Sequence, residues 1–160
     1  MRLSNRSAYG VRAALDLAMN SCLNPVTIKD LSDRQEVSID YLEQIMYRLG
    51  KADLVRSVRG PGGGYVLAKN PADITVGQIV RALEEDGLIV SVKCFNPRER
   101  GDGCDNARSS VCVTRKLWER ITAGIDGLFD AVSLKDLCYE LRDLMVMQGA
   151  GREGAAGDNS

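Results

Sequence analysis

Three cysteines are the residues of this chain best suited to chemistry, because they fall together in one irregular stretch. Cys94, Cys104 and Cys112 lie within residues 88–113, among glycine, aspartate and asparagine, where little could bury them. Soft thiolates gathered in a loop suit an iron–sulfur cluster, zinc or copper. Their spacing matches neither a ferredoxin nor a zinc ribbon, so redox-active thiols and a chance grouping stay open as alternatives.

The other two cysteines and the absence of histidine limit the kinds of site that the chain could form. Cys22 and Cys138 fall on predicted apolar helices, and we expect both to be buried thiols. An odd number of cysteines, five in all, argues against a disulfide framework. The chain has no histidine, which excludes Ser–His and Cys–His catalysis and leaves cysteine and carboxylate as the main metal ligands. Without a nucleophile beside a base or a cofactor motif, the sequence does not favour an enzyme.

A glycine-rich segment is the second suggestive feature. Four glycines and a proline stand between Arg59 and Tyr65. They can form neither helix nor regular strand, whereas residues 55–58 and 65–68 favour strand. The pattern therefore predicts a β-hairpin with the cation Arg59 at its tip. A phosphate-binding loop would need a following helix and a Gly-Lys-Ser/Thr triplet, which this segment lacks. A plain hairpin turn remains the alternative.

The elements before the hairpin are predicted to be three helices. The first spans residues 5–21, the second opens at Thr27 with Asp30 in a capping-box position, and Ser38 caps the third. Apolar residues at offsets of three, six, seven and ten form the expected inner face of the third helix: Ile39, Leu42, Ile45, Met46 and Leu49. Its opposite face is polar: Asp40, Tyr41, Glu43, Gln44, Tyr47 and Arg48.

This polar face suits nucleic acid. Tyrosine, Gln44 and Arg48 can donate to phosphates and base edges, and Glu43 can accept from a cytosine amino group while repelling other edges. An ordinary solvated face is the alternative. Helix, turn, polar helix and basic hairpin together form a winged helix-turn-helix, whose usual partner is duplex DNA. The charge agrees: residues 1–70 carry ten basic and seven acidic side chains, whereas the whole chain has a net charge of −1.

The second half is predicted to hold a dimerisation element. Thr75 and Gln78 begin a short helix, and Thr114 caps a long one. The long helix carries a stripe spaced by four, four, three and four residues: Leu117, Ile121, Ile125, Leu128 and Val132. Little chain remains to cover it, which indicates self-association, with packing on its own domain as the alternative. A last helix starts at residues 133–136.

Four segments follow from these boundaries. They are a DNA-binding domain over 1–70, a short helix and cysteine loop over 71–113, dimerisation and C-terminal helices over 114–148, and a disordered tail over 149–160. The expected fold is mainly α with a small hairpin. No apolar run is long enough to span a membrane and the N-terminus lacks a signal peptide, so we expect a cytoplasmic protein without a membrane partner.

Residues 1–118 resemble the IscR-type regulators of the Rrf family, winged-helix transcription factors that often carry an iron–sulfur cluster. The matching stretches are Met1-Arg2-Leu3, residues 31–35, Ser38 to Gln44 with its Tyr-Leu-Glu-Gln, the wing from Ser57 to Tyr65, Val76-Gly77 and Leu117-Trp118. The hairpin glycines together with Tyr-Leu-Glu-Gln are a specific pattern. The chain beyond about residue 133 matches less.

The resemblance implies roles for individual residues. The third helix would enter the major groove and the wing the minor groove of the DNA. Base edges or phosphates would contact Ser38, Tyr41, Glu43 and Gln44, and Arg59 with the adjacent Gly60 would form the wing contact. In these regulators the glutamate at the position of Glu43 helps to discriminate between operator classes.

The resemblance also implies that the three clustered cysteines ligate an iron–sulfur cluster, of the [2Fe-2S] or [4Fe-4S] type. The family pattern places a histidine where this chain has Arg115, and a nitric-oxide-sensing relative has an aspartate where this chain has Ala8. The fourth ligand is therefore unassigned. A carboxylate, Cys22, Cys138, a residue of a partner subunit or an exogenous ligand could fill the position.

The sequence thus predicts a homodimeric transcription regulator that binds a pseudo-palindromic duplex. Its cluster state would tune DNA affinity and control genes for cluster assembly, iron or redox. The alternative is a thiol- or metal-dependent regulatory protein that acts through a protein partner without a cluster.

Overall fold

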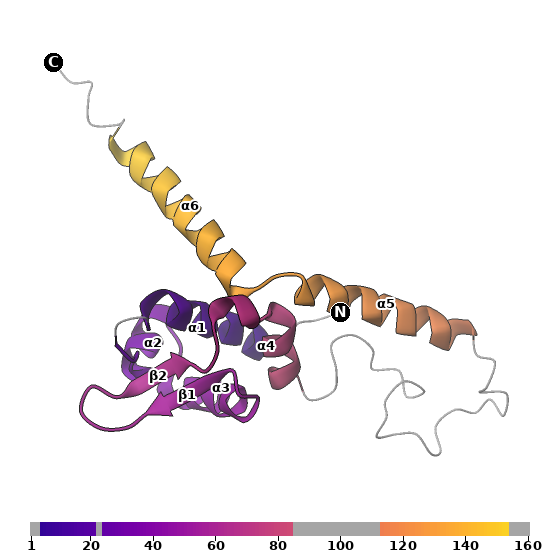
Figure 1. The fold of residues 1–160 in the computed structure, drawn as a ribbon, viewed down its shortest axis with the longest axis horizontal. Helices are drawn as coiled ribbons and strands as arrows, with labels where there is room; N and C mark the ends of the chain where they lie inside the picture. The colour runs from indigo at the N-terminus through magenta and orange to yellow at the C-terminus, as the bar shows by residue number, and fades with distance from the viewer. Residues whose placement is uncertain (1–3, 22–23, 85–112, 154–160) are drawn as a thin grey trace.

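The computed structural model describes residues 4–21, 24–84 and 113–153, a mainly helical fold with one two-stranded hairpin, as predicted (Figure 1). The elements in order are α1 (Asn5–Asn20), α2 (Ile28–Gln35), α3 (Ile39–Lys51), β1 (Val55–Val58), β2 (Gly64–Leu67), the 3-10 turn η1 (Pro71–Asp73), α4 (Val76–Leu83), α5 (Val113–Asp130) and α6 (Leu134–Glu153). Elements α1 to α4 form one body with the hairpin, and α5 and α6 extend from it in different directions (Figure 1). None of the described helices is long and apolar enough to cross a membrane.

Side-chain caps begin two helices as the sequence predicts. The Thr27 hydroxyl accepts the Asp30 N–H at 3.1 Å at the start of α2. At the start of α4, the Thr75 hydroxyl accepts the Gln78 N–H and the Gln78 side chain accepts the Thr75 N–H, both at 3.2 Å. Ser38 occupies the N-cap position of α3, but its side chain makes no capping hydrogen bond. The exposed Ser38 hydroxyl is therefore not used to begin the helix.

The hairpin is held against the helices by a third segment. Strands β1 and β2 pair antiparallel, with Val55 opposite Leu67 and Val58 opposite Gly64. Tyr65 also bridges to Val26, just before α2, through backbone hydrogen bonds of 2.7 and 3.0 Å. This bridge fixes the wing relative to the helix-turn-helix, so the two elements present their outer surfaces together.

The core is built mainly from α1, α3 and α4. Its largest fully buried apolar side chains are Leu17, Leu31, Leu42, Ile45, Met46, Leu49, Ile74, Ile79, Val80, Leu83 and Leu134. Cys138 of α6 joins the same cluster with 9% of its surface exposed, which confirms the predicted buried thiol. The prediction that Ile39 points inward is wrong, since Ile39 is 40% exposed. It is the first residue of α3 and lies beyond the edge of the core.

The junction between α5 and α6 is tied to the start of α4. Thr75 and Ser133 form an isolated antiparallel bridge. Beside it, Asp130 at the end of α5 accepts hydrogen bonds from Arg81 at 2.6 Å and from the Thr75 hydroxyl at 3.1 Å. The hydrogen bonds from Arg81 hold the pKa of Asp130 below its usual value. The C-terminal end of α5 is therefore fixed to α4.

The bounds of the last two helices differ from the predicted ones. Helix α5 begins at Val113 rather than after a cap at Thr114, and it ends at Asp130. Val132, the last residue of the predicted stripe, therefore lies beyond the end of the helix. Helix α6 continues to Glu153 and includes the first residues of the segment from Gly149 that was expected to be disordered. The division of the chain at residues 70 and 113 stays a prediction.

Candidate nucleic-acid interface

The outward face of α3 is polar and open. Its inner side chains are buried in the core, which leaves Glu43 and Gln44 exposed and Tyr47 with 65% of its surface exposed. Ser38 and Asp40 are exposed at the start of the same helix. A helix that buries one face and presents hydrogen-bonding side chains on the other has the form that DNA-reading helices take.

Tyr41 differs from its neighbours because it is only partly exposed. Its ring packs edge-on against Tyr9 of α1, with centroids 6.1 Å apart and an angle of 87° between the planes. It also packs against the hydrophobic core. The sequence predicted a DNA contact here, and the structure adds a packing role. Only the outer part of the side chain is open to a partner.

A groove of about 570 Å³ separates α3 from the wing. Residues of both elements line it: Glu43, Met46, Tyr47, Gly50, Lys51, Asp53, Val55, Arg56, Ser57 and Tyr65. Within it the Lys51 ammonium lies 5.1 Å from the centroid of the Tyr47 ring. Helix α3 and the hairpin thus share one surface, and a partner that fills the groove contacts both elements.

Arg59 stands at the tip of the wing. It is exposed and makes no hydrogen bond or ion pair within the described part of the chain. The adjacent Gly60 has φ +99° and Gly62 has φ +75°, a backbone region that L side chains rarely adopt. The Gly63 N–H donates to the Gly60 carbonyl at 2.9 Å and closes the turn. The glycines therefore set the shape of the tip and add no side chains beside Arg59.

Gly64 has a different function from the glycines of the tip. A Cβ at this position would collide with the Val26 carbonyl oxygen. Gly64 therefore allows β2 to approach the segment before α2 closely enough for the bridge between Tyr65 and Val26. This glycine positions the wing, whereas Gly60 and Gly62 shape its end.

Two cations of this surface were missed in the sequence. Lys51 ends α3 and Arg56 is exposed on β1, and both line the groove. Sequence signals existed for both. Lys51 is four residues after Tyr47, on the same side of the helix. Arg56 lies on the first strand of a hairpin with a basic tip, but a four-residue strand is too short for alternation to assign the side of its side chain.

Glu43 places a negative charge in this groove, whose other charged lining residues are Lys51, Arg56 and Asp53. Burial, and then the negative charge of Glu43, raise the pKa of the Tyr65 phenol above its ordinary value. Tyr65 therefore stays protonated at neutral pH, with Glu43 across the groove from it. With Asp53 it offsets the charge of Lys51 and Arg56. A carboxylate here weakens attraction to phosphate and favours partners with a hydrogen-bond donor at this point.

The predicted metal ligands cannot be placed on this surface. Cys94, Cys104 and Cys112 fall in residues 85–112, outside the described part, as does Cys22. Among the residues that are described, no three cysteine, aspartate or glutamate side chains converge as a metal site would require. The last described residue before that segment, Glu84, accepts hydrogen bonds at 2.6 Å from the hydroxyls of Ser4 and Ser7. The start of α1 is thus tied to the end of α4.

Comparison with known proteins decides the family. A family model described as Rrf2, iron-dependent transcriptional regulator, matches residues 3–140. The chain belongs to the Rrf2 family. A regulator of Photobacterium profundum named HTH-type transcriptional regulator IscR is 38% identical over 160 residues, which cover 100% of this chain and 87% of that protein. The Escherichia coli regulator of the same name is 38% identical over 153 residues, 96% of this chain and 88% of its own.

Solved Rrf2-like structures have the same arrangement. IscR from T. potens superposes with a TM-score of 0.67 at 35% identity, covering 88% of both chains. CymR, described as the global cysteine regulator of B. subtilis, superposes with a TM-score of 0.67 at 30% identity and covers 88% of this chain and 98% of its own. Rrf2 membership, together with IscR-named relatives over nearly the whole chain, makes this chain a DNA-binding transcriptional regulator and is consistent with one that senses iron–sulfur status.

Proposed function

We propose that this regulator binds a pseudo-palindromic DNA duplex as a homodimer, with α3 in the major groove and Arg59 in the minor groove. The observation that carries the proposal is the groove shared by α3 and the wing, beside exposed polar side chains of α3 and a tip arginine that has no partner among the described residues. Ser38, Glu43 and Gln44 are exposed along α3, and Arg59 with Gly60 is exposed at the wing. Lys51 and Arg56 add positive charge between them.

The chemistry of each side chain suggests its role in DNA binding. Arginine at the tip supplies charge to a narrow minor groove, where negative potential is concentrated. Ser38 has a hydroxyl that the helix cap does not use, which suits a phosphate contact at the start of α3. Glu43 selects rather than attracts, because a carboxylate is repelled by phosphate and accepts only from donor edges such as the cytosine amino group.

The exposed stripe of α5 supports the homodimer. Leu117 is 50% exposed, Trp118 37% and Leu128 72% on a helix fixed to the body at its C-terminal end. Large apolar side chains concentrated on one exposed helix are typical of an interface. A second copy of α5 would cover them, and two recognition helices would then meet two half-sites.

We further propose that Cys94, Cys104 and Cys112 hold an iron–sulfur cluster in this cytoplasmic regulator. The donor set fits: three thiolates occur in one segment of a chain without histidine, and thiolates are the ligands that iron–sulfur clusters prefer. When bound, a cluster with only three cysteine ligands supplies an iron that reacts readily with oxidants or chelators. The fourth ligand and the cluster type stay open.

Selection of binding sites from random duplexes tests the DNA proposal. The protein is purified anaerobically and used both as isolated and after removal of iron. We expect enrichment of a sequence with approximate two-fold symmetry in at least one of these states. If neither state enriches any sequence, the proposal that α3 and the wing read DNA is refuted.

Iron and acid-labile sulfide, measured in five single Cys→Ala variants, test the cluster. Variants at Cys94, Cys104 and Cys112 should lose iron, sulfide and the visible charge-transfer absorbance. The Cys138→Ala variant is the control, since Cys138 is buried in the core and should keep the cluster. Loss at Cys22 or Cys138 comparable to loss at the other three would contradict this ligand assignment.

A further inference from the structure

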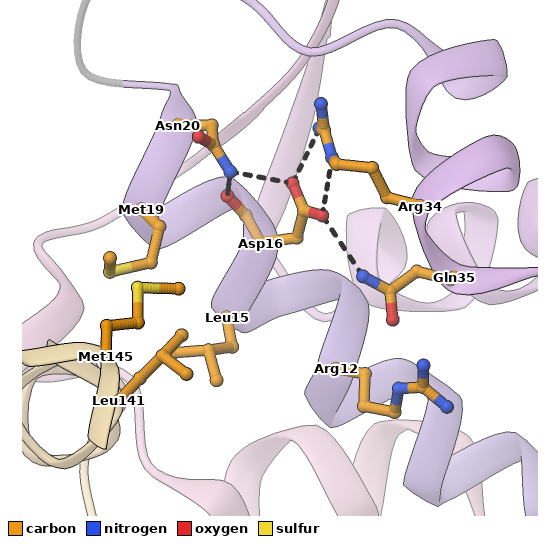
Figure 2. Close-up of a pocket in the computed structure, with 9 residues that line it drawn as sticks. All are labelled: Arg12, Leu15, Asp16, Met19, Asn20, Arg34, Gln35, Leu141 and Met145. Atoms are coloured by element: carbon orange, nitrogen blue, oxygen red, sulfur yellow. Dashed lines mark hydrogen bonds and ion pairs between the residues drawn. The ribbon is translucent and has the colours of Figure 1, made fainter. Parts of the chain in front are cut away.

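A second surface, remote from the wing, lies between α1 and α6. We call it the α1–α6 groove; it has a volume of about 490 Å³. Its apolar side is formed by Leu15 and Met19 of α1 and Leu141 and Met145 of α6, which gather where the two helices face each other (Figure 2). This volume lies within the range of small-molecule sites, which are mainly apolar with a few placed polar groups.

The polar side of the groove is held rigidly. The buried Asp16 carboxylate accepts hydrogen bonds from Arg34 at 2.7 and 2.8 Å, from Gln35 at 3.1 Å and from Asn20 at 3.1 Å (Figure 2). A bidentate arginine–carboxylate pair has a fixed geometry. The Nε and Nη2 atoms of Arg34 are used, so its Nη1 group is still able to donate.

Arg12 gives the groove its net charge. It is exposed, and it has no acidic partner among the described residues; its guanidinium lies 5.4 Å from the centroid of the Tyr9 ring. Figure 2 draws no bond from Arg12 to any other lining residue. The ionised lining groups are therefore Arg12, Arg34 and Asp16, two positive and one negative, which leaves one positive charge without a counterion.

We propose that the α1–α6 groove binds a small amphipathic monoanion, a carboxylate with a short apolar tail. The tail would lie on the leucine and methionine side chains and the carboxylate would face Arg12. A cation is repelled by the net charge of the groove, and a neutral molecule of the same shape loses the charge-assisted hydrogen bonds. None of the residues predicted to contact DNA lines this groove.

The test uses hexanoate as the probe and methionine methyl groups as reporters. The full-length protein, labelled with ¹³C at its five methionine methyls, is titrated with hexanoate, hexanol and hexylamine. Met19 and Met145 line the groove, whereas Met46 is buried in the core and Met147 is exposed with 72% of its surface open. We expect saturable shifts at Met19 and Met145 with hexanoate alone, and constant signals at Met46 and Met147.

Arg12→Gln should weaken hexanoate binding by about tenfold, the effect of one lost charge-assisted hydrogen bond. Arg12→Lys should restore most of it. Lys29→Gln is the matched control, because it removes one exposed positive charge outside the groove and should leave the affinity unchanged. The proposal is overturned if Met147 responds as Met19 does, if hexanol competes equally, or if Arg12→Gln binds as tightly as the parent. It is also overturned if a second protein copy fills the groove. The Met19 and Met145 signals would then shift with protein concentration and would not respond to hexanoate.

Discussion

Arg59→Ala gives the sharpest test of the DNA-binding surface, since the structure separates its effect on binding from its effect on folding. Arg59 is exposed and has no bonded partner within the described residues. Its removal should change the free energy of unfolding by less than about 0.5 kcal/mol. Any loss of affinity then reports a contact with DNA rather than damage to the wing, whose shape comes from Gly60, Gly62 and the bridge to Val26.

The size of the loss follows from the kind of contact. One arginine in a narrow minor groove contributes about 1–3 kcal/mol, so each wing should lose about 5- to 150-fold in affinity. With roughly eight phosphate contacts per dimer, the parent should show a slope of log K against log salt near −7. Removing one cation from each wing should reduce the steepness of that slope by about 2.

Fluorescence anisotropy with a labelled operator, titrated at several salt concentrations, measures both quantities. Lys135→Ala is the control, because Lys135 is an exposed cation of α6, away from α3 and the wing. It should change neither affinity nor slope. Arg59→Ala with the affinity and slope of the parent would refute the placement of the wing in the minor groove.

Three further predictions rest on single residues. Glu43→Ala should broaden the set of duplexes recovered by binding-site selection, and an unchanged motif would contradict the filter role of Glu43. If the parent is a dimer as proposed, Leu128→Glu, at a side chain 72% exposed, should sediment as a monomer, and a variant that stays dimeric would remove α5 from the interface. Partial burial raises the pKa of Glu84, but hydrogen bonds from Ser4 and Ser7 outweigh it and hold that pKa below 4.5. Because the pKa is depressed in the folded state, this stabilisation is present above the unfolded pKa and is lost as pH falls through the folded one. Glu84→Gln should therefore be less stable than the parent in urea at pH 7, with a gap that closes as pH falls below 4.5; a gap independent of pH would contradict this.

Local signals in the sequence were sufficient for the elements that carry the DNA-binding surface. Thr27 and the pair Thr75–Gln78 begin helices because capping depends on neighbours three residues away. The hairpin followed from its glycines and its β-branched flanks. The residues predicted to contact DNA, on α3 and the wing, are exposed as the sequence predicted. Tyr41 is the exception, because it packs against Tyr9 of a different helix. Their contacts with DNA remain predictions.

Long-range pairings were the part that the sequence could not provide. Val132 continues the spacing of the α5 stripe, but the bridge between Thr75 and Ser133 ends the helix before it. Asp16 is a carboxylate on the buried face of α1. A buried carboxylate needs a partner, but the sequence does not identify which residue that partner is. Arg34 lies eighteen residues away, and nothing local identifies it as that partner. The α1–α6 groove depends on this pair and was therefore not visible in the sequence.

Helix α1 is the element through which these surfaces are connected. Its first turn holds Glu84 through Ser4 and Ser7, at the point where the chain leaves α4 for the segment with the three cysteines. One turn later Tyr9 packs on Tyr41 of α3, and a Cβ on Gly10 would collide with Leu83 of α4. Close packing of this kind transmits displacement because it leaves no space to absorb it. These contacts place α1 between the end of α4 and the Tyr41 side of α3.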